Sequence, residues 1–156
     1  MKKTNNKGFS LVELIIVIAI MAILIGVLAP QYIKYVEKSR ISSDKDMVDS
    51  LTKAVQTACT DEDYYDNLAN GNNVQISKAG GIVTNGDALS DAIDEFYGTS
   101  GGTDTNKKFK SKAFSGVTVT ITITEVVNPD TGAVSLQAKV EDSAHPGVPY
   151  DPANFK

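Results

Sequence analysis

The stretch KGFSLVELIIVIAIMAILIGVLAP, Lys7–Pro30, holds the longest apolar run of the chain, with one carboxylate, Glu13, inside it. From Leu14 to Ala29 no side chain is charged or polar. As a helix, the 21 residues from Phe9 to Ala29 would be about 31 Å long, enough to cross the hydrocarbon core of a bilayer. The run predicts a membrane-crossing helix, and Glu13 is the residue whose presence needs a reason.

Charge is unevenly distributed along the 156 residues, whose net charge is −4. Lys2, Lys3 and Lys7 precede the apolar run, which predicts a cytoplasmic N-terminus by the positive-inside rule. Beyond Pro30 there are 12 basic and 18 acidic residues. This acidic part argues against nucleic acid as the main partner, because duplex binding is dominated by neutralisation of phosphates.

Two ordinary interpretations of the N-terminal segment compete with a more specific one. A secretory signal peptide should end in a small-residue cleavage site such as Ala-x-Ala, but Ala29 is followed by Pro30 and the helical pattern continues. A permanent single-pass anchor would tolerate Glu13 near the headgroups. However, ionisable residues at membrane depth usually have a partner.

The motif KGFSLVELIIVIAIMAIL combines a short basic leader ending at Gly8 with Phe9, Ser10, Glu13 and a long apolar helix. It resembles the N-terminal signature of type IV pilins, in the type IVa-like form, and of the related pseudopilins. The resemblance is strong over about the first thirty residues and extends to the rest only in architecture. It implies an α+β, pilin-like fold in which a long N-terminal helix packs on a small antiparallel sheet.

The resemblance also divides the chain into four parts. These are a prepilin leader peptide at 1–8, a membrane and filament-core helix at 9–30, an amphipathic helix half at 31–59 and a globular head at 60–156. The residues support the amphipathic half independently, since apolar positions there repeat at intervals of three and four. They are Met47, Val48, Leu51, Ala54, Val55 and Ala58.

Processing follows from the resemblance as well. A prepilin peptidase would cut between Gly8 and Phe9, and the new N-terminus at Phe9 would be methylated. Glu13 would then attract the amine of Phe9 in an adjacent subunit during assembly, because a charge pair is strong in apolar surroundings. The chain would be the peptidase's substrate and not an enzyme, with no catalytic residue, metal or cofactor of its own.

The implied function is that of a structural subunit of type IV pili, which serve adhesion, motility or surface attachment. Its partners would be copies of itself, the prepilin peptidase and the pilus assembly machinery in the membrane. The precursor would lie in the cell membrane and the product in an extracellular pilus.

Pro30 lacks the N–H that would bond to the carbonyl of Gly26, so at least a kink is expected there. The resemblance further implies that the helix unwinds between about Gly26 and Pro30 in the assembled fibre.

The head contains one clear strand signal, GVTVTITITEVVNPDTGAVSLQAKVED, at residues 116–142. Apolar and threonine residues alternate on both sides of the turn sequence NPDTG, which predicts an antiparallel hairpin packed on the amphipathic helix. A short helix is predicted from near Asp87, and the sequence YGTSGGTDTN at 97–106 is expected to be a flexible loop.

Other features of the head favour ordinary interpretations. The acidic cluster at 61–66 is expected to be a solvated turn, since it lacks the spacing of a calcium-binding loop. The threonine face is expected to be a solvated sheet surface, although an ice-binding or carbohydrate-binding surface is an alternative. A basic patch could meet acidic residues of a neighbouring subunit, and extracellular DNA is a further candidate partner without support. The patch comprises Lys107, Lys108, Lys110 and Lys112.

Cys59 and His145 are the sole residues of their types. No intrachain disulfide can form, and His145 is expected to be a loop residue beside Pro146. Because Gram-negative relatives of the family usually close a C-terminal loop with a disulfide, the resemblance favours a Gram-positive, clostridial-type major pilin.

Two further functions remain open. A pseudopilin of a type II secretion or DNA-uptake system shares the N-terminal motif. A membrane-anchored extracellular binding domain or enzyme is the alternative of another class, against which stands the lack of a phosphate loop, a nucleophile motif or metal-ligand spacing.

Overall fold

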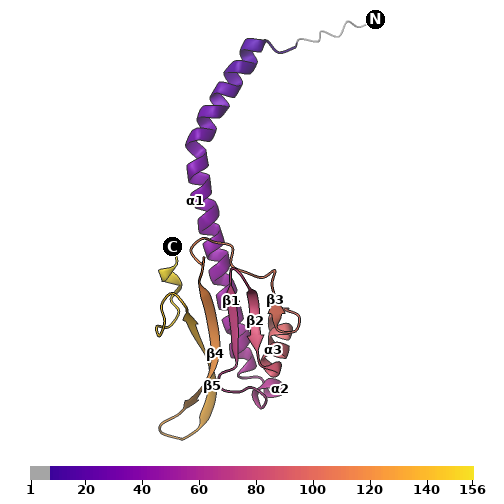
Figure 1. Ribbon diagram of the computed structural model, residues 1–156, viewed down its shortest axis with the longest axis vertical. Coiled ribbons are helices and arrows are strands. Elements are labelled where there is room, and N and C mark those ends of the chain that lie inside the picture. The colour runs from indigo at the N-terminus through magenta and orange to yellow at the C-terminus, as the bar shows by residue number, and fades with distance from the viewer. Residues whose placement is uncertain (1–7) are drawn as a thin grey trace, which may run out of the picture. The chain divides into compact units, whose positions relative to one another are not determined.

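The structure is a computed structural model that describes residues 8–156. The three predicted leader lysines lie outside the described residues. The chain forms two compact units, one ending at Glu37 and the other comprising Lys38–Lys156. Helix α1, Leu11–Ala58, contributes residues to both (Figure 1).

The first part of α1, from Leu11 to Ala29, is apolar on all sides apart from Glu13. Every residue from Gly8 to Leu28 is exposed. The helix is long and apolar enough to cross a membrane. It continues through Gly26 and Pro30, so the prediction of one long helix is confirmed. The predicted unwinding concerns the assembled fibre and stays a prediction.

The second part of α1, from Ile41 to Ala58, buries one face and exposes the other, as the apolar spacing predicts. Its buried residues recur every three or four positions, so they form a stripe along one face. They are Ile41, Asp44, Val48, Leu51, Ala54, Val55 and Ala58.

Five strands form one sheet in the order β3-β2-β1-β4-β5, and all neighbouring strands are antiparallel. The strands are β1 (Asn73–Ser77), β2 (Gly81–Asn85), β3 (Thr103–Asp104), β4 (Thr118–Val127) and β5 (Val134–Asp142). The β4–β5 pair confirms the predicted hairpin, with Val119 opposite Asp142 and Val127 opposite Val134. The β1–β2 hairpin and β3 were not predicted.

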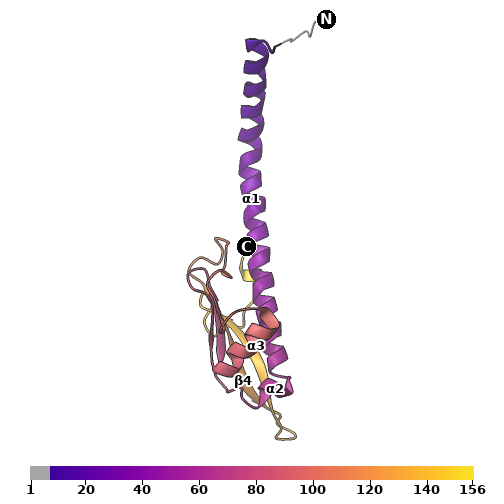
Figure 2. The ribbon, with the colours of Figure 1, turned by 90° about the vertical axis from the view of Figure 1, so that its right-hand side faces the viewer.

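One face of the sheet and the second part of α1 enclose the core (Figure 2). In β4, Val119, Ile121 and Ile123 are fully buried, whereas the alternating threonines are half-buried. The side chains of Val48, Leu51 and Val55 come from α1, and those of Val74, Ile76 and Ile82 from β1 and β2. Helix α3 (Asp87–Tyr97) adds Leu89, Ala92 and Ile93.

Two short elements occupy segments expected to be irregular. The acidic cluster at 61–66 forms one helical turn, α2 (Glu62–Tyr65), because the carboxylate of Asp61 caps it by accepting the N–H of Asp63 at 2.9 Å. The turn is helical, and its side chains are exposed except for the half-buried Asp61 and Tyr64. The segment 97–106 contains β3, whose Asp104 backbone lies so close to Gly81 that a Cβ there would collide with it.

Helix α3, Asp87–Tyr97, begins where predicted. At its end, Asp94 accepts hydrogen bonds from the hydroxyl of Thr99 and from the N–H groups of Gly101 and Gly102. These bonds, chiefly that from Thr99, lower the pKa of Asp94. The segment predicted as a flexible loop is thus hydrogen-bonded to the helix that precedes it.

The C-terminal segment is held by aromatic packing. Phe155, only 4% exposed, follows the 3₁₀ turn Pro152–Asn154. Its ring stacks on that of Phe114 with the centroids 4.2 Å apart, and also on that of Tyr150 with the centroids 5.7 Å apart. The N–H of Tyr150 also donates to the carbonyl of Val140 at 2.9 Å. These contacts hold the C-terminal segment in a chain whose single cysteine cannot form an intrachain disulfide.

The loop before β4 is attached to α1 by Asp44, whose side chain is buried. Its carboxylate accepts the N–H of Lys110 at 2.9 and 3.1 Å and the N–H of Ser111 at 2.8 Å. Two backbone donors far along the chain therefore share one acceptor on the helix. Hydrogen bonds to a charged acceptor are among the stronger ones in proteins.

The Phe155→Ala variant should lower the free energy of unfolding by about 3 kcal/mol, because it leaves a cavity beside Phe114. The measurement is denaturant unfolding of the full chain in detergent. Val148→Ala is the matched control, since Val148 lies in the same segment but is 51% exposed. Equal stability of the two variants would show that the C-terminal segment is not anchored by Phe155.

Asp44→Ala should cost about 3 kcal/mol in the same measurement, because the N–H groups of Lys110 and Ser111 lose their acceptor. Asp44→Asn keeps one acceptor oxygen and should fall between the wild type and Asp44→Ala. Asp46→Ala, an exposed position on the same helix, serves as the control. A loss no larger than that of Asp46→Ala contradicts the role assigned to Asp44.

Candidate functional site

The start of α1 is organised around Ser10 and Glu13. The N–H of Ser10 donates to Oε2 of Glu13 at 2.8 Å. In return, the hydroxyl of Ser10 accepts the N–H of Val12 at 3.4 Å, and its carbonyl accepts the N–H of Leu14 at 3.2 Å. Ser10 is thus the N-cap residue and Glu13 the N3 residue of a capping box.

This geometry gives Glu13 a partner within its own chain. The sequence predicted only one partner for Glu13, the amine of Phe9 in another subunit, and that pairing stays a prediction. The signal for the local role was present in the sequence as Ser-x-x-Glu before an apolar run, which is the pattern of a capping box. A carboxylate at a helix N-terminus is also favoured by the helix dipole.

The predicted cleavage site lies just before the helix. Gly8 and Phe9 are outside α1, and Phe9 is 89% exposed. A Cβ added at Gly8 would meet nothing within 4 Å. Because the backbone between these residues is not helical and not covered by described residues, a protease could approach it.

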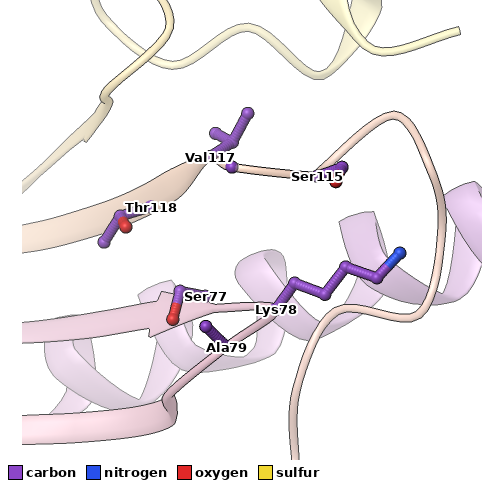
Figure 3. Close-up of a pocket in the computed structure, with 7 residues that line it drawn as sticks. Ser77, Lys78, Ala79, Ser115, Val117 and Thr118 are labelled. Atoms are coloured by element: carbon purple, nitrogen blue, oxygen red, sulfur yellow. The ribbon is translucent and has the colours of Figure 1, made fainter.

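A shallow hollow of the head, at the end of β1 and the start of β4, contains a cationic side chain (Figure 3). Its lining includes Ser77, Lys78, Ser115 and Thr118. The ammonium of Lys78 already donates to the carbonyl of Ser111 at 2.8 Å, so this charge supports the loop. The hydroxyls of the lining belong to Ser77, Ser115 and Thr118, and its basic group, the ammonium of Lys78, is bound to a carbonyl, so the lining does not indicate a nucleophile and base pair.

The basic patch is partly structural. Nζ of Lys107 donates to the carbonyls of Tyr97 and Gly98 at 3.1 and 2.7 Å and lies 4.7 Å from the centroid of the Tyr97 ring. It therefore satisfies carbonyls at the C-terminal end of α3. The backbone of Lys110 is bound by Asp44. Neither contact favours nucleic acid as a partner.

Cys59 and His145 occupy ordinary structural positions. Cys59 is buried, and this burial raises the pKa of its thiol, which disfavours the reactive thiolate. Nδ1 of His145 lies 2.9 Å from Oδ1 of Asp142, which also accepts the N–H groups of Ala144 and His145 in a loop. Among residues 8–156, no group of three or more His, Cys, Asp or Glu side chains could hold a metal ion.

The pKa of Tyr64, in the head, is strongly raised. The hydroxyl of Tyr64 donates to the carboxylate of Glu95, and this bond raises the pKa of Tyr64 to about 12. The pair connects α2 with α3, where the rings of Tyr64 and Phe96 also meet edge to face. The shift is therefore explained by packing between two helices and does not indicate acid–base chemistry.

Comparison with known proteins places the N-terminal region in a defined class. Residues 3–29 match the family described as the prokaryotic N-terminal methylation motif. The chain is 37% identical over 66 residues, 42% of its length, to the type IV major pilin protein PilA of Myxococcus xanthus, 30% of which is covered. It is 37% identical over 59 residues to the type IV major fimbrial protein FimA of Dichelobacter nodosus, with 38% of each protein covered.

A longer match is to the fimbrial protein EcpC of Eikenella corrodens, 36% identical over 98 residues, which covers 54% of this chain and 64% of that protein. No solved structure matches. The chain spans 30% to 38% of the length of the first two relatives. Its N-terminal region carries the prokaryotic N-terminal methylation motif and is similar to the corresponding region of type IV pilins.

These relatives are pilins of Gram-negative bacteria and are not clostridial. They support the broader prediction of a type IV pilin and give no support to the Gram-positive assignment. That assignment rested on the lack of a cysteine pair, which does not determine the source of the chain.

Ser10→Ala should loosen the first turn of α1, because the N–H of Val12 loses its side-chain acceptor. Loss of an N-cap typically costs about 1 kcal/mol, so amide exchange at Val12 in detergent should accelerate roughly fivefold. Ser42→Ala, an exposed mid-helix change, is the control and should leave Val12 unaffected. Unchanged exchange at Val12 in the Ser10→Ala variant contradicts the capping role.

Proposed function

We propose that the chain is the precursor of a type IV major pilin, a structural subunit that polymerises through its N-terminal helix into extracellular pili. The observation that carries this proposal is the capping box of Ser10 and Glu13, which begins an exposed apolar helix two residues after an accessible Gly8–Phe9 bond. The class of the relatives supports it.

In this proposal the prepilin peptidase cuts after Gly8 and leaves Phe9 as a methylated N-terminus. The new ammonium group lies on the residue next to Ser10, at the same end of α1 as Glu13. Only Oε2 of Glu13 accepts the bond from Ser10, and a carboxylate has capacity for several hydrogen bonds. One carboxylate can therefore cap its own helix and pair with the Phe9 ammonium of a neighbouring subunit.

Polymerisation would also cover the exposed surface of the first part of α1. Leu11, Ile23 and Ile25 are 73%, 68% and 64% exposed. Such a continuous apolar surface is stable in lipid or against other apolar helices, but not in water. Copies of this chain supply helices of the same composition, so the transfer from membrane to fibre keeps the surface out of water.

The proposed role is structural, and the chain acts as a substrate of the peptidase. Assembly requires the membrane machinery as a further partner. Of the alternative functions, the pseudopilin shares the motif. The relatives that match are described as major pilins and fimbrial proteins, and we therefore favour the pilin.

Two variants separate the charge of Glu13 from its capping role. Glu13→Gln retains an oxygen that can accept the N–H of Ser10 but cannot pair with an ammonium, whereas Glu13→Val loses both interactions. If the ion pair drives assembly, both variants should reduce sheared surface fibres at least tenfold while cleavage continues. The measurements are electron microscopy of the fibres and mass spectrometry of the mature N-terminus.

Glu125→Gln, an exposed change in β4, is the control and should leave fibre yield unchanged. Normal fibres from Glu13→Gln would show that capping, and not charge, is what assembly needs. A mature chain that begins elsewhere than at methylated Phe9 would overturn the proposed function itself.

A further inference from the structure

Tyr32 and Tyr35 are unusual among the tyrosines of the described chain. Each is 70% exposed, whereas Tyr65, the next most exposed, is at 37%. Within residues 8–156, neither side chain takes part in a hydrogen bond or a ring contact. Because they are three positions apart on α1, their rings lie on the same face of the helix.

Their distance from Glu13 matches the thickness of a membrane. Glu13 and Tyr32 are 19 positions apart in one helix, which corresponds to about 28 Å, close to the roughly 30 Å of a bilayer's hydrocarbon core. Between them, Gln31 alone carries a polar side chain, directly before Tyr32. Lys34 and Lys38 follow, so charged side chains begin where the apolar stretch ends.

We propose that Tyr32 and Tyr35 bind the outer lipid–water interface of the inserted precursor and set the depth of the helix. This inference rests on the membrane-inserted stage of the proposed function. Tyrosine suits this position because its ring is apolar and its hydroxyl can bond to polar headgroup oxygens. With these rings at the outer interface, Glu13 lies at the cytoplasmic interface.

A lipid interface suits these residues better than the apolar surface of another helix. Each phenol hydroxyl needs a hydrogen-bond partner when it leaves water. Headgroups and interfacial water supply such partners on every side, whereas an apolar helix supplies none. The position of Lys34 between the two tyrosines agrees, because a lysine near a membrane boundary extends its ammonium toward the headgroups.

The chain contains no tryptophan, so a single introduced one reports depth without interference. The reporter is Leu28→Trp, placed four residues before Tyr32. The full-length variant is reconstituted in vesicles of dioleoylphosphatidylcholine and dioleoylphosphatidylglycerol. Lipids brominated at different depths of the acyl chain then quench the fluorescence according to the depth of the reporter.

When Tyr32→Ala and Tyr35→Ala are added to this reporter, the helix position at the outer lipid–water interface should move from Tyr32 to Lys34. Two residues of helix rise correspond to about 3 Å, so quenching should indicate a reporter about 3 Å deeper in the bilayer. Ile20→Ala with Ile23→Ala is the matched control, since these exposed residues have the same spacing and lie within the apolar stretch. The control should leave the depth of the reporter unchanged.

An unchanged reporter depth in the tyrosine variant, or an equal shift in the control, overturns the interface role. Fibre yield of the wild-type chain is measured separately in cells. Absence of fibres together with the expected depth shift contradicts the proposed function and supports the interface role. Fibres without a depth shift support the function and overturn the interface role.

Discussion

The burial of one face of the second part of α1 is the contact on which the head depends. Val48, Leu51 and Val55 are almost completely buried, and they share one core with the inward side chains of the sheet. Nine buried apolar side chains from β1, β2, β4 and α3 would have no common surface to pack on without this stripe. Hydrophobic burial of this kind is the dominant favourable term in folding.

Two attachments complete the head where a disulfide was not available. Asp44 binds the backbone of the loop before β4, and Phe155 packs the C-terminal segment into the core. Both act on segments without regular strands, which otherwise have few backbone hydrogen bonds to keep them in place. The carboxylate of Asp44 and the aromatic stack of Phe155 thus hold these two segments in place, as a disulfide would by restricting the chain.

The parts of the fold that sequence predicts well are those with long periodic patterns. The alternation of apolar and threonine residues extends over eight residues, Val117–Thr124, and the helical repeat over several turns, so each signal is repeated. β1 has only five residues, NVQIS, in which two buried positions carry the whole pattern. Its pairing with β4 is non-local, and β3 has two residues whose place is set by the partner strand.

Asp44 was missed for a different reason, although a signal existed. It occupies a position of the buried stripe, between Ile41 and Val48, where the pattern calls for an apolar residue. A carboxylate there must have hydrogen-bond partners, because an isolated buried charge is strongly disfavoured. The sequence could therefore have predicted an acceptor at Asp44, but not which donors reach it, since Lys110 and Ser111 lie 66 and 67 positions away.

In the proposed assembly, Glu13 would satisfy two requirements at different stages. It accepts the N–H of Ser10, so its carboxylate would already have a partner at the membrane boundary of the proposed precursor. This hydrogen bond lowers the free-energy cost of keeping an ionised group near hydrocarbon, and that cost is highest for a carboxylate without a hydrogen-bond partner. The donor in this bond, the backbone N–H of Ser10, is uncharged. Hydrogen bonds between two charged groups are stronger. A carboxylate that is already oriented by its own helix therefore keeps the ability to bind an ammonium more tightly when one is produced.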